Sequence, residues 1–244
     1  PTYIENWPKE LILLSFAQID IPLDRIQTDV LERMIFNEKM GSKTIVKNIN
    51  IIIPNLQKDI DSFPNGCFVR LGSRSPKDSW YGIENGFRVT NVKDFIGLFC
   101  GSERIFEDLF LAKDNDYLPH IYLREWKEIP EWTEFRCFMK NRKLVGISQY
   151  HYLENKYFPE IENDKDTIIF CIEKFFNDFK NISHLDDVIF DIYIKMKFKN
   201  NESLNEIKLI EINPFLSNTD PCLFDWQKEK DFDGSLRYNK NKEL

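Results

Sequence analysis

Three oxygen-bearing side chains near the end of the chain, Asp191, Glu211 and Asn213, have types and spacing that could bind a metal ion. The aspartate lies in the apolar run Val188–Phe198, and the other two lie in the run Ile207–Asn213. Both runs predict strands, and the polar, Asn-rich segment between them predicts a hairpin loop. In an antiparallel pair, Asp191 lies opposite the Glu211–Asn213 stretch, whose two polar side chains share one face.

Two carboxylates and an amide oxygen form a set of hard ligands suited to Mg²⁺. This ion usually keeps several waters and completes its shell with nucleotide phosphates, so the set predicts an ATP site. The alternative is that Asp191 and Glu211 are ordinary solvent-facing residues of a half-exposed hairpin. Because each lies inside an apolar run, where an unpaired charge is costly, the metal-site interpretation is favoured.

A second segment rich in polar chemistry, Arg70–Asp78, begins at the end of a predicted strand and continues past it. It carries three cations and two serines around one glycine. Backbone N–H groups near a glycine can approach phosphate oxygens and the cations can neutralise them, so Arg70, Ser75 and Lys77 are candidate nucleotide contacts. The alternative is an exposed basic turn, since Gly, Ser, Pro and Asp all favour turns. The spacing is not that of a Walker A loop.

The middle of the chain offers weaker candidates. The segment Leu123–Pro130 is a possible connector between two lobes, whose backbone would bind adenine while Trp126 covers the ring; a strand end with a packed Trp explains it equally well. Glu134 and Arg136 share a strand face and could contact a nucleotide or simply pair with each other. Gln149, at the end of the next predicted strand, could form a hydrogen bond in the same cleft. No catalytic nucleophile is recognisable.

The composition describes a folded protein with a packed core. The 244 residues are 42% hydrophobic and include 21 Phe, which suits one large domain or two small lobes. The net charge of −7 argues against unspecific binding to nucleic acid or acidic membranes. The five Cys are odd in number and widely spaced, and the three His show no zinc spacing, which predicts reduced thiols in the cytoplasm and no zinc site. We find no apolar run long enough to span a bilayer and no signal peptide, and we expect a monomer.

Hydrophobic periodicity predicts both helices and strands. Helices are expected at 24–39, with an apolar face of Ile26, Val30, Leu31, Met34 and Ile35, at 92–99 and at 166–180. Strands are expected at 67–71, 120–126, 134–139 and 143–150, in addition to the hairpin. The polar tail after Trp226 is expected to be partly mobile. Because most strands are joined as hairpins, the pattern predicts an α+β fold.

Seven short motifs occur in an order that resembles the cell division cycle protein 123 family, over about residues 66 to 227. They are Ser75–Asp78 after Arg70, Leu123–Trp126, Glu134–Phe138, Gly146–Gln149, Phe190–Tyr193, Asn213–Phe215 and Thr219–Trp226. The resemblance implies an ATP-grasp-like fold, in which two α+β lobes hold ATP and Mg²⁺ between them. On this basis residues 1–122 are the expected N-terminal lobe and residues 123–244 the expected C-terminal lobe.

The resemblance also implies roles for individual positions. Asp191, Glu211 and Asn213 would bind Mg²⁺, and Arg70 would replace a phosphate-contacting Lys. Arg136 and Lys77 would be further phosphate or site residues, and Arg124–Trp126 the adenine hinge. Three departures change the expected site: Arg70 stands for that Lys, Glu211 for an Asp, and Tyr150 for an Arg that often follows Ser-Gln. The resemblance therefore supports nucleotide binding by this chain more strongly than it supports a particular partner.

Three functions follow from these patterns. The first is an ATP- and Mg²⁺-dependent assembly chaperone that binds the gamma subunit of translation initiation factor 2, as eukaryotic members of the family do. The richness in Asn, Lys and Ile indicates an AT-rich microbial or viral genome, so that the partner could belong to a host. The second is an ATP-dependent ligase or a phosphoryl or nucleotidyl transferase, including an RNA-end ligase. The third, a scaffold without nucleotide, fits least well because the three metal-ligand candidates are present.

Overall fold

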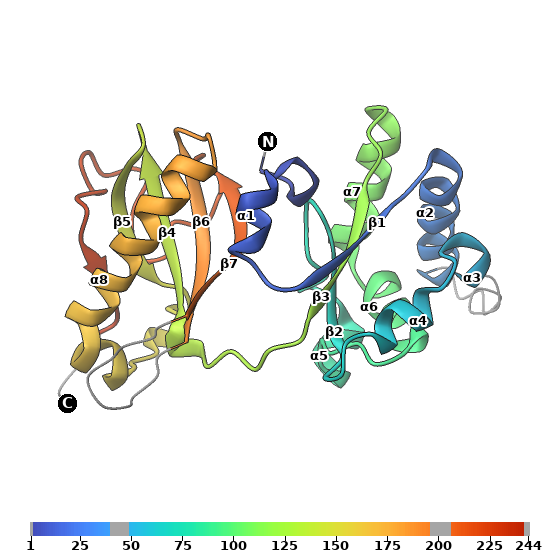
Figure 1. Cartoon of the computed structure of the whole chain (residues 1–244), viewed down its shortest axis with the longest axis horizontal. Helices are drawn as coiled ribbons and strands as arrows, with labels where there is room; N and C mark the ends of the chain where they lie inside the picture. The colour runs from blue at the N-terminus through green and yellow to red at the C-terminus, as the bar shows by residue number, and fades with distance from the viewer. Residues whose placement is uncertain (1, 40–48, 196–205, 242–244) are drawn as a thin grey trace. The chain divides into compact units, whose positions relative to one another are not determined.

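The chain divides into two compact units in the computed structural model, which describes residues 2–39, 49–195 and 206–241. Residues Ala17–Lys127 form one unit, here called the continuous unit (Figure 1). The segments Pro1–Phe16 and Glu128–Leu244 together form the other, here called the discontinuous unit. The expected boundary between residues 122 and 123 falls within a strand, whereas the observed units divide after Lys127.

The continuous unit combines one small sheet with several helices. Its elements are β1 (Gln18–Pro22), α2 (Arg25–Lys39), α3 (Ile49–Ile52), α4 (Leu56–Asp61), β2 (Cys67–Leu71), α5 (Trp80–Asn85), α6 (Val92–Cys100), α7 (Glu103–Asp114) and β3 (His120–Glu125). The strands are ordered β1-β3-β2 and both pairings are antiparallel. The predicted strands at 67–71 and 120–126 and the predicted helix at 92–99 are confirmed within one residue.

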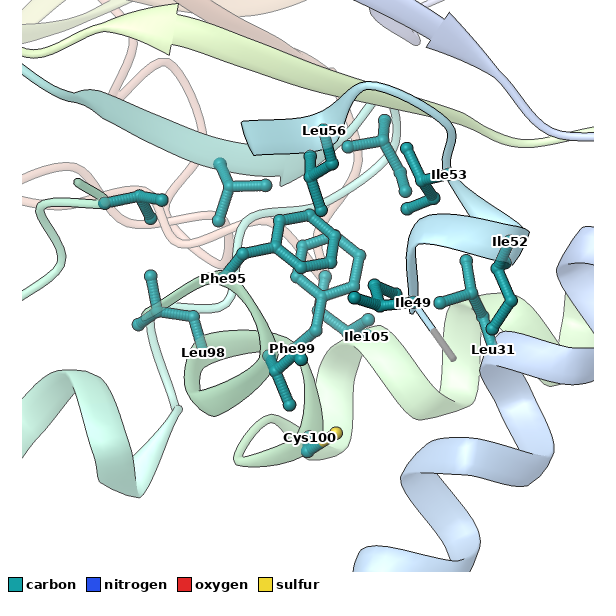
Figure 2. Close-up of a cluster of buried hydrophobic side chains, with 14 of the residues drawn as sticks. Leu31, Ile49, Ile52, Ile53, Leu56, Phe95, Leu98, Phe99, Cys100 and Ile105 are labelled. Atoms are coloured by element: carbon teal, nitrogen blue, oxygen red, sulfur yellow. The ribbon is translucent and has the colours of Figure 1, made fainter. Parts of the chain in front are cut away.

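The core of this unit is apolar and lies between the helices and one face of the sheet. Figure 2 shows Phe95 and Phe99 of α6 at its centre, stacked with ring centroids 4.5 Å apart. The two rings come from positions i and i+4 of one helix, which share a face. Val69 and Leu71 of β2 join the same cluster, so alternate residues of that strand face the helices.

The buried face of α2 differs from the expected one. Ile26 and Val30 are 75% and 38% exposed, while Leu31 and Ile35 are fully buried. Thr28 is buried as well, because its hydroxyl donates to the Asp24 carbonyl at 2.8 Å and so satisfies its polar group. The buried residues Thr28, Leu31 and Ile35 keep helical spacing. Ile26 and Val30 lie outside this buried face of the helix.

The discontinuous unit is built on a larger sheet. Its elements are a 3₁₀ turn (Ile4–Asn6), α1 (Lys9–Leu13), a second 3₁₀ turn (Glu131–Thr133), β4 (Glu134–Lys140), β5 (Lys143–Gln149), a third 3₁₀ turn (Leu153–Asn155), α8 (Pro159–Ile182), β6 (Val188–Lys195), β7 (Glu206–Pro214) and β8 (Leu236–Arg237). The strand order is β7-β6-β4-β5-β8, antiparallel except for the short parallel pair of β5 with β8. The expected strands and hairpin are confirmed where described; the expected loop and the end of the first strand at Phe198 lie outside the described residues.

Helix α8 covers one face of this sheet (Figure 1). The Phe179 ring stacks on Phe190 of β6 at 4.3 Å, and Phe175 and Phe176 lie close to the same ring. The helix begins at Pro159, seven residues before the expected start. Pro suits the first helical position because its missing N–H has no intrahelical partner there. None of the helices in the described ranges is long and apolar enough to cross a membrane.

The chain after Trp226 was expected to be partly mobile, but much of it packs against the other face of the sheet. The Phe232 ring lies 5.0 Å from Phe138 of β4 and 4.8 Å from Trp226. The Arg237 guanidinium lies 4.0 Å above the Phe224 ring and forms an ion pair with Asp231 at 2.8 Å. One aromatic ring and one guanidinium thus dock this polar segment, because a buried aromatic ring covers a large apolar area and the guanidinium packs on a second ring.

The first residues of the chain belong to the discontinuous unit because they pair with β7. The Leu209 amide donates to the Leu14 carbonyl at 2.8 Å, and the Ser15 hydroxyl donates to the Leu209 carbonyl at 2.6 Å. Leu11 and Trp7 are buried behind this contact. The segment thus covers the edge of β7, where unpaired backbone groups would otherwise remain.

Candidate functional site

Strands β4, β6 and β7 bring three of the predicted site residues into one row. Arg136 lies opposite Asp191 in the β4–β6 pair, and Asp191 lies opposite Glu211 in the β6–β7 pair. Residues opposite each other in neighbouring strands point to the same face, so the three side chains adjoin. Asn213, two residues from Glu211, shares this face and lies opposite Ile189.

A β-bulge keeps this row together. The register of the β6–β7 pair shifts between Asp191 and Ile192, so that Ile192 lies opposite Leu209 and Ile210 is the extra residue. An extra residue reverses which side chains face the core beyond it. Leu209 therefore lies on the sheet face of Ile192, whereas Glu211, beyond the bulge, lies on the opposite face with Asp191.

Arg136 and Asp191 form a buried, two-pronged ion pair. The guanidinium Nε and Nη2 each donate to one Asp191 carboxylate oxygen at 2.8 Å. Its Nη1 donates to the main-chain oxygen of Asp220 at 2.8 Å, and the guanidinium lies 5.0 Å from the centre of the Tyr150 ring. Glu211 lies further off, with 4.0 Å between its Oε1 and Nη2. The alternative that Asp191 is an ordinary solvent-facing residue is wrong, since the residue is 0% exposed.

Asp191 is held between opposing electrostatic effects. Burial raises the pKa of its carboxyl to about 6, although the charge and hydrogen bonds of Arg136 act in the opposite direction. The negative charges of Glu211 and Glu134 raise the pKa further. Burial and the two neighbouring carboxylates thus act against the charged form of Asp191, and Arg136 acts in its favour.

The donor set at this place fits a hard cation such as Mg²⁺. Among the described residues, no group of three or more His, Cys, Asp or Glu side chains is placed to hold a metal ion. A ligand set here consequently depends on the Asn213 amide beside the carboxylates of Asp191 and Glu211. The Asn213 amide nitrogen donates to Glu211 Oε1 at 3.3 Å, which leaves the amide oxygen as the available ligand atom.

Glu134 and Gln149 lie at the end of the same sheet but differ in their surroundings. The Glu134 carboxylate is 3.0 Å from the His151 Nε2 atom. Gln149 lies opposite Phe135 and so on the other face from Arg136. Its side-chain nitrogen donates to the carbonyls of His151 and Lys156, at 2.5 and 2.9 Å. Its amide thus holds the following loop in place.

In the continuous unit, the sheet places two predicted arginines on one face. Arg70 lies opposite Tyr122, and Phe68 lies opposite Arg124, so both arginines point away from the core of Figure 2. Both are buried, and the Arg70 Nε donates to the Leu71 carbonyl at 3.0 Å.

The loop that follows Arg70 has two kinds of polar residue. Ser75 is buried and Lys77 is exposed. Asp78 serves the helices: its carboxylate accepts from the Ser102 hydroxyl at 2.5 Å and from the Arg104 amide at 3.1 Å, at the start of α7. Arg74 forms an exposed ion pair with α7 at 3.3 Å. Part of this polar segment is therefore structural.

The expected adenine hinge is anchored through its amides. The Glu125 amide donates to the Ala17 carbonyl at 2.8 Å, and the Trp126 amide donates to the Gly66 carbonyl at 3.1 Å. The Trp126 side chain is half-buried.

Sequence reasoning missed the contribution of the loop after β5 and of Asp220. The rings of Tyr150, His151 and Tyr152 contact Arg136, Glu134 and Asp220 in turn, with 3.0 Å between the Tyr152 hydroxyl and the Asp220 carboxylate. Asp220 lies within one of the motifs, which was its only sequence signal. A run of three ring residues at a strand end would have been a further one.

Comparison with known proteins gives a consistent result. Residues 35–242 match the model of the D123 family. The chain is 32% identical over 183 residues to a Xenopus laevis protein named translation initiation factor eIF2 assembly protein, covering 71% of this chain and 52% of that protein. It is 33% identical over 201 residues to the CDC123-like protein L884 of Acanthamoeba polyphaga mimivirus, covering 79% of this chain and 61% of that one. The chain thus spans about half the length of the curated relatives it matches.

The fold agrees as well. The solved structure of Cdc123 from Schizosaccharomyces pombe matches with a TM-score of 0.74 and 22% identity, over 93% of this chain and 88% of that one. This likeness confirms the expected α+β fold and shows that the chain has the fold of that structure. Because the family model covers most of the sequence and the expected motifs lie within it, this chain belongs to the D123 family, that of cell division cycle protein 123.

Proposed function

We propose that this protein is an ATP- and Mg²⁺-binding assembly chaperone for translation initiation factor 2, docking on its gamma subunit. The observation that carries the nucleotide half of the proposal is the row of Arg136, Asp191 and Glu211, two carboxylates and one guanidinium on one sheet face. Similar proteins named as eIF2 assembly proteins support the other half.

Asp191, Glu211 and Asn213 would hold the metal. A bound Mg²⁺ would supply charge neutralisation for the nucleotide phosphates. Arg136 already touches two of these acidic groups, and its five N–H donors suit a phosphate as well as a carboxylate. It would keep Asp191 oriented while offering one edge to a phosphate oxygen.

The continuous unit would supply further contacts. Arg70, Ser75 and Lys77 are the proposed phosphate contacts, and Arg124–Trp126 the proposed adenine contacts. Arg70 replaces a Lys here, and its planar fork can hold two phosphate oxygens at once. Since the Glu125 and Trp126 amides are already engaged, adenine would bind the carbonyls of this segment or the Trp126 ring.

The partner half of the proposal names the gamma subunit of translation initiation factor 2. This subunit could be that of a host. This half rests on the names of relatives that are about twice as long as the matched segment. A pull-down with the purified gamma subunit, with and without ATP, tests it. Retention of the subunit is the expected result, and empty beads in both conditions would contradict this half alone.

Calorimetric titration of ATP tests the nucleotide half, with Mg²⁺ and again with EDTA. We expect binding that requires Mg²⁺ and is at least tenfold weaker in Glu211→Gln. This substitution removes the negative charge of one proposed metal ligand, while Arg136 keeps its ion pair with Asp191. Glu206→Gln, on the same strand, is the matched control and should bind as the unaltered protein does. Thermal melting of each variant checks that it is folded.

The absence of Mg²⁺-dependent binding in the unaltered protein would overturn the nucleotide half. Equal affinities of Glu211→Gln and the control would place the metal elsewhere. Assay of the same samples for ADP and AMP tests the ligase or transferase alternative, which predicts turnover with an acceptor.

A further inference from the structure

A hollow of about 360 Å³ lies beside the candidate site, within the discontinuous unit. The loop after β5 forms one side of it and the segment at Asp220 the other. We call it the loop hollow. Side chains that line it include Tyr150, His151, Tyr152, Glu154, Lys156 and Asp220.

The basic groups of the loop hollow are already paired with acids outside it. The Lys156 ammonium lies 2.9 and 2.8 Å from the two carboxylate oxygens of Glu131. The His151 ring lies 3.0 Å from the Glu134 carboxylate. Neither group therefore adds a free positive charge to the hollow.

The acidic groups are not balanced in the same way. The Asp220 carboxylate accepts from the Tyr152 hydroxyl at 3.0 Å and from the Cys222 amide at 2.8 Å, both neutral donors. Within the described residues, neither Asp220 nor Glu154 forms a close ion pair, although Glu154 feels the charge of Lys156. Arg136 reaches only the main-chain oxygen of Asp220, while its own charge is paired with Asp191. The hollow thus keeps an excess of negative charge.

The walls of the hollow are aromatic and firmly held. The rings of Tyr150 and Tyr152 line it, and a cation close to a tyrosine face is stabilised by the ring electrons. The loop is fastened at several points: Gln149 donates to two of its carbonyls, and the Asn239 side chain donates to the Tyr152 and Lys156 carbonyls at 2.7 and 3.2 Å. A preformed site loses little entropy when it binds a ligand.

We propose that the loop hollow binds the guanidinium or ammonium group of an Arg or Lys side chain presented by a partner protein. Asp220 accepts hydrogen bonds from the cation and Glu154 adds to its attraction, while the two tyrosines enclose the aliphatic stem. A phosphate or carboxylate would meet the same negative charges and be repelled. The site needs no nucleotide, and its acidic groups, Asp220 and Glu154, are not among the candidate metal ligands.

The test uses the full chain without nucleotide and three short peptides. They are acetyl-Gly-Arg-Gly-amide, its Lys counterpart, and a citrulline counterpart that keeps the shape of Arg without its charge. Titrations are followed through the backbone amide NMR signals of residues 150–156, Asp220, Cys222 and Leu223. We expect the Arg and Lys peptides to shift these signals, and citrulline to bind at least about tenfold more weakly.

The substitution Asp220→Asn tests whether the Asp220 charge binds the cation. The amide keeps the size and the acceptor oxygen for Tyr152 but loses the charge, so binding of the Arg peptide should weaken about tenfold. Glu229→Gln, an exposed change in the same unit, is the matched control and should leave binding unaltered. Equal binding of Arg and citrulline, signal shifts elsewhere in the unit, or an unchanged affinity in Asp220→Asn would each overturn the proposal. Because ATP is absent, none of these results bears on the nucleotide half of the proposed function.

Discussion

The row of Arg136, Asp191 and Glu211 and the segment Arg70–Asp78 were both predicted to bind ATP or its Mg²⁺, and the structure treats them differently. In the row, strand pairing alone sets which side chains meet, and all three point to one face. In the loop, Asp78 anchors a helix and Arg74 pairs with that helix. Polar residues on paired strands have their neighbours fixed by register, whereas polar residues in a loop are often used to hold the loop itself.

The largest expected effect comes from breaking the row. Arg136→Ala leaves Asp191 charged, buried and without its partner, which should lower the free energy of unfolding by about 3–5 kcal/mol. Arg74→Ala, which removes an exposed ion pair from the loop, should cost about 1 kcal/mol or less. Urea unfolding followed by tryptophan fluorescence compares the two. Similar small losses would mean that the row contributes no more than a surface contact.

A smaller effect separates the two roles within the loop. Asp78→Ala removes the acceptor of the Ser102 hydroxyl and the Arg104 amide, and should lower the free energy of unfolding by about 1–2 kcal/mol. Lys77→Ala, one residue earlier and exposed, should change it by less than about 0.5 kcal/mol. ATP titration should then show weaker binding for Lys77→Ala alone. If the Asp78 variant lost ATP binding instead, Asp78 would be a nucleotide contact and not only an anchor of the helix.

The smallest expected effect is a pH dependence of that anchor. Burial acts to raise the pKa of Asp78, but hydrogen bonds from Ser102 and the backbone outweigh it, so the pKa lies below its ordinary value of 3.8. The stabilisation is then fully present above about pH 4 and is lost as the pH falls through the lowered pKa. The stability difference between the unaltered protein and Asp78→Asn, measured by urea unfolding from pH 7 to pH 2.5, should shrink only below about pH 4. A constant difference would contradict this.

Regular alternation explains what the sequence allowed us to predict. The strands at Cys67–Leu71 and Glu134–Lys140 and the facing of Asp191 and Glu211 all followed from a period of two. The bulge at Ile210 carries no clear sequence signal, and it is this extra residue that places Glu211, rather than Ile210, opposite Asp191.

Elements with apolar residues on several sides were harder to predict. Helix α7 was not expected, because the exposed Phe110 and Leu111 blur the buried spacing of Ile105, Leu109 and Ala112. The docking of the tail after Trp226 depends on contacts distant in sequence, which local periodicity does not contain. The assignment of residues 1–16 to the discontinuous unit is of the same kind.

The pairing of Ser15 with Leu209 sets an order on the synthesis of the protein. The two residues are 194 positions apart, so at roughly 5–20 residues per second the first segment would wait about 10–40 s for its partner strand. The continuous unit is complete well before then and can fold as the rest of the chain is made. Until α8 and β7 emerge, the apolar residues of the first segment lack their native partners, so a growing chain exposes them to chaperones and proteases for most of its synthesis.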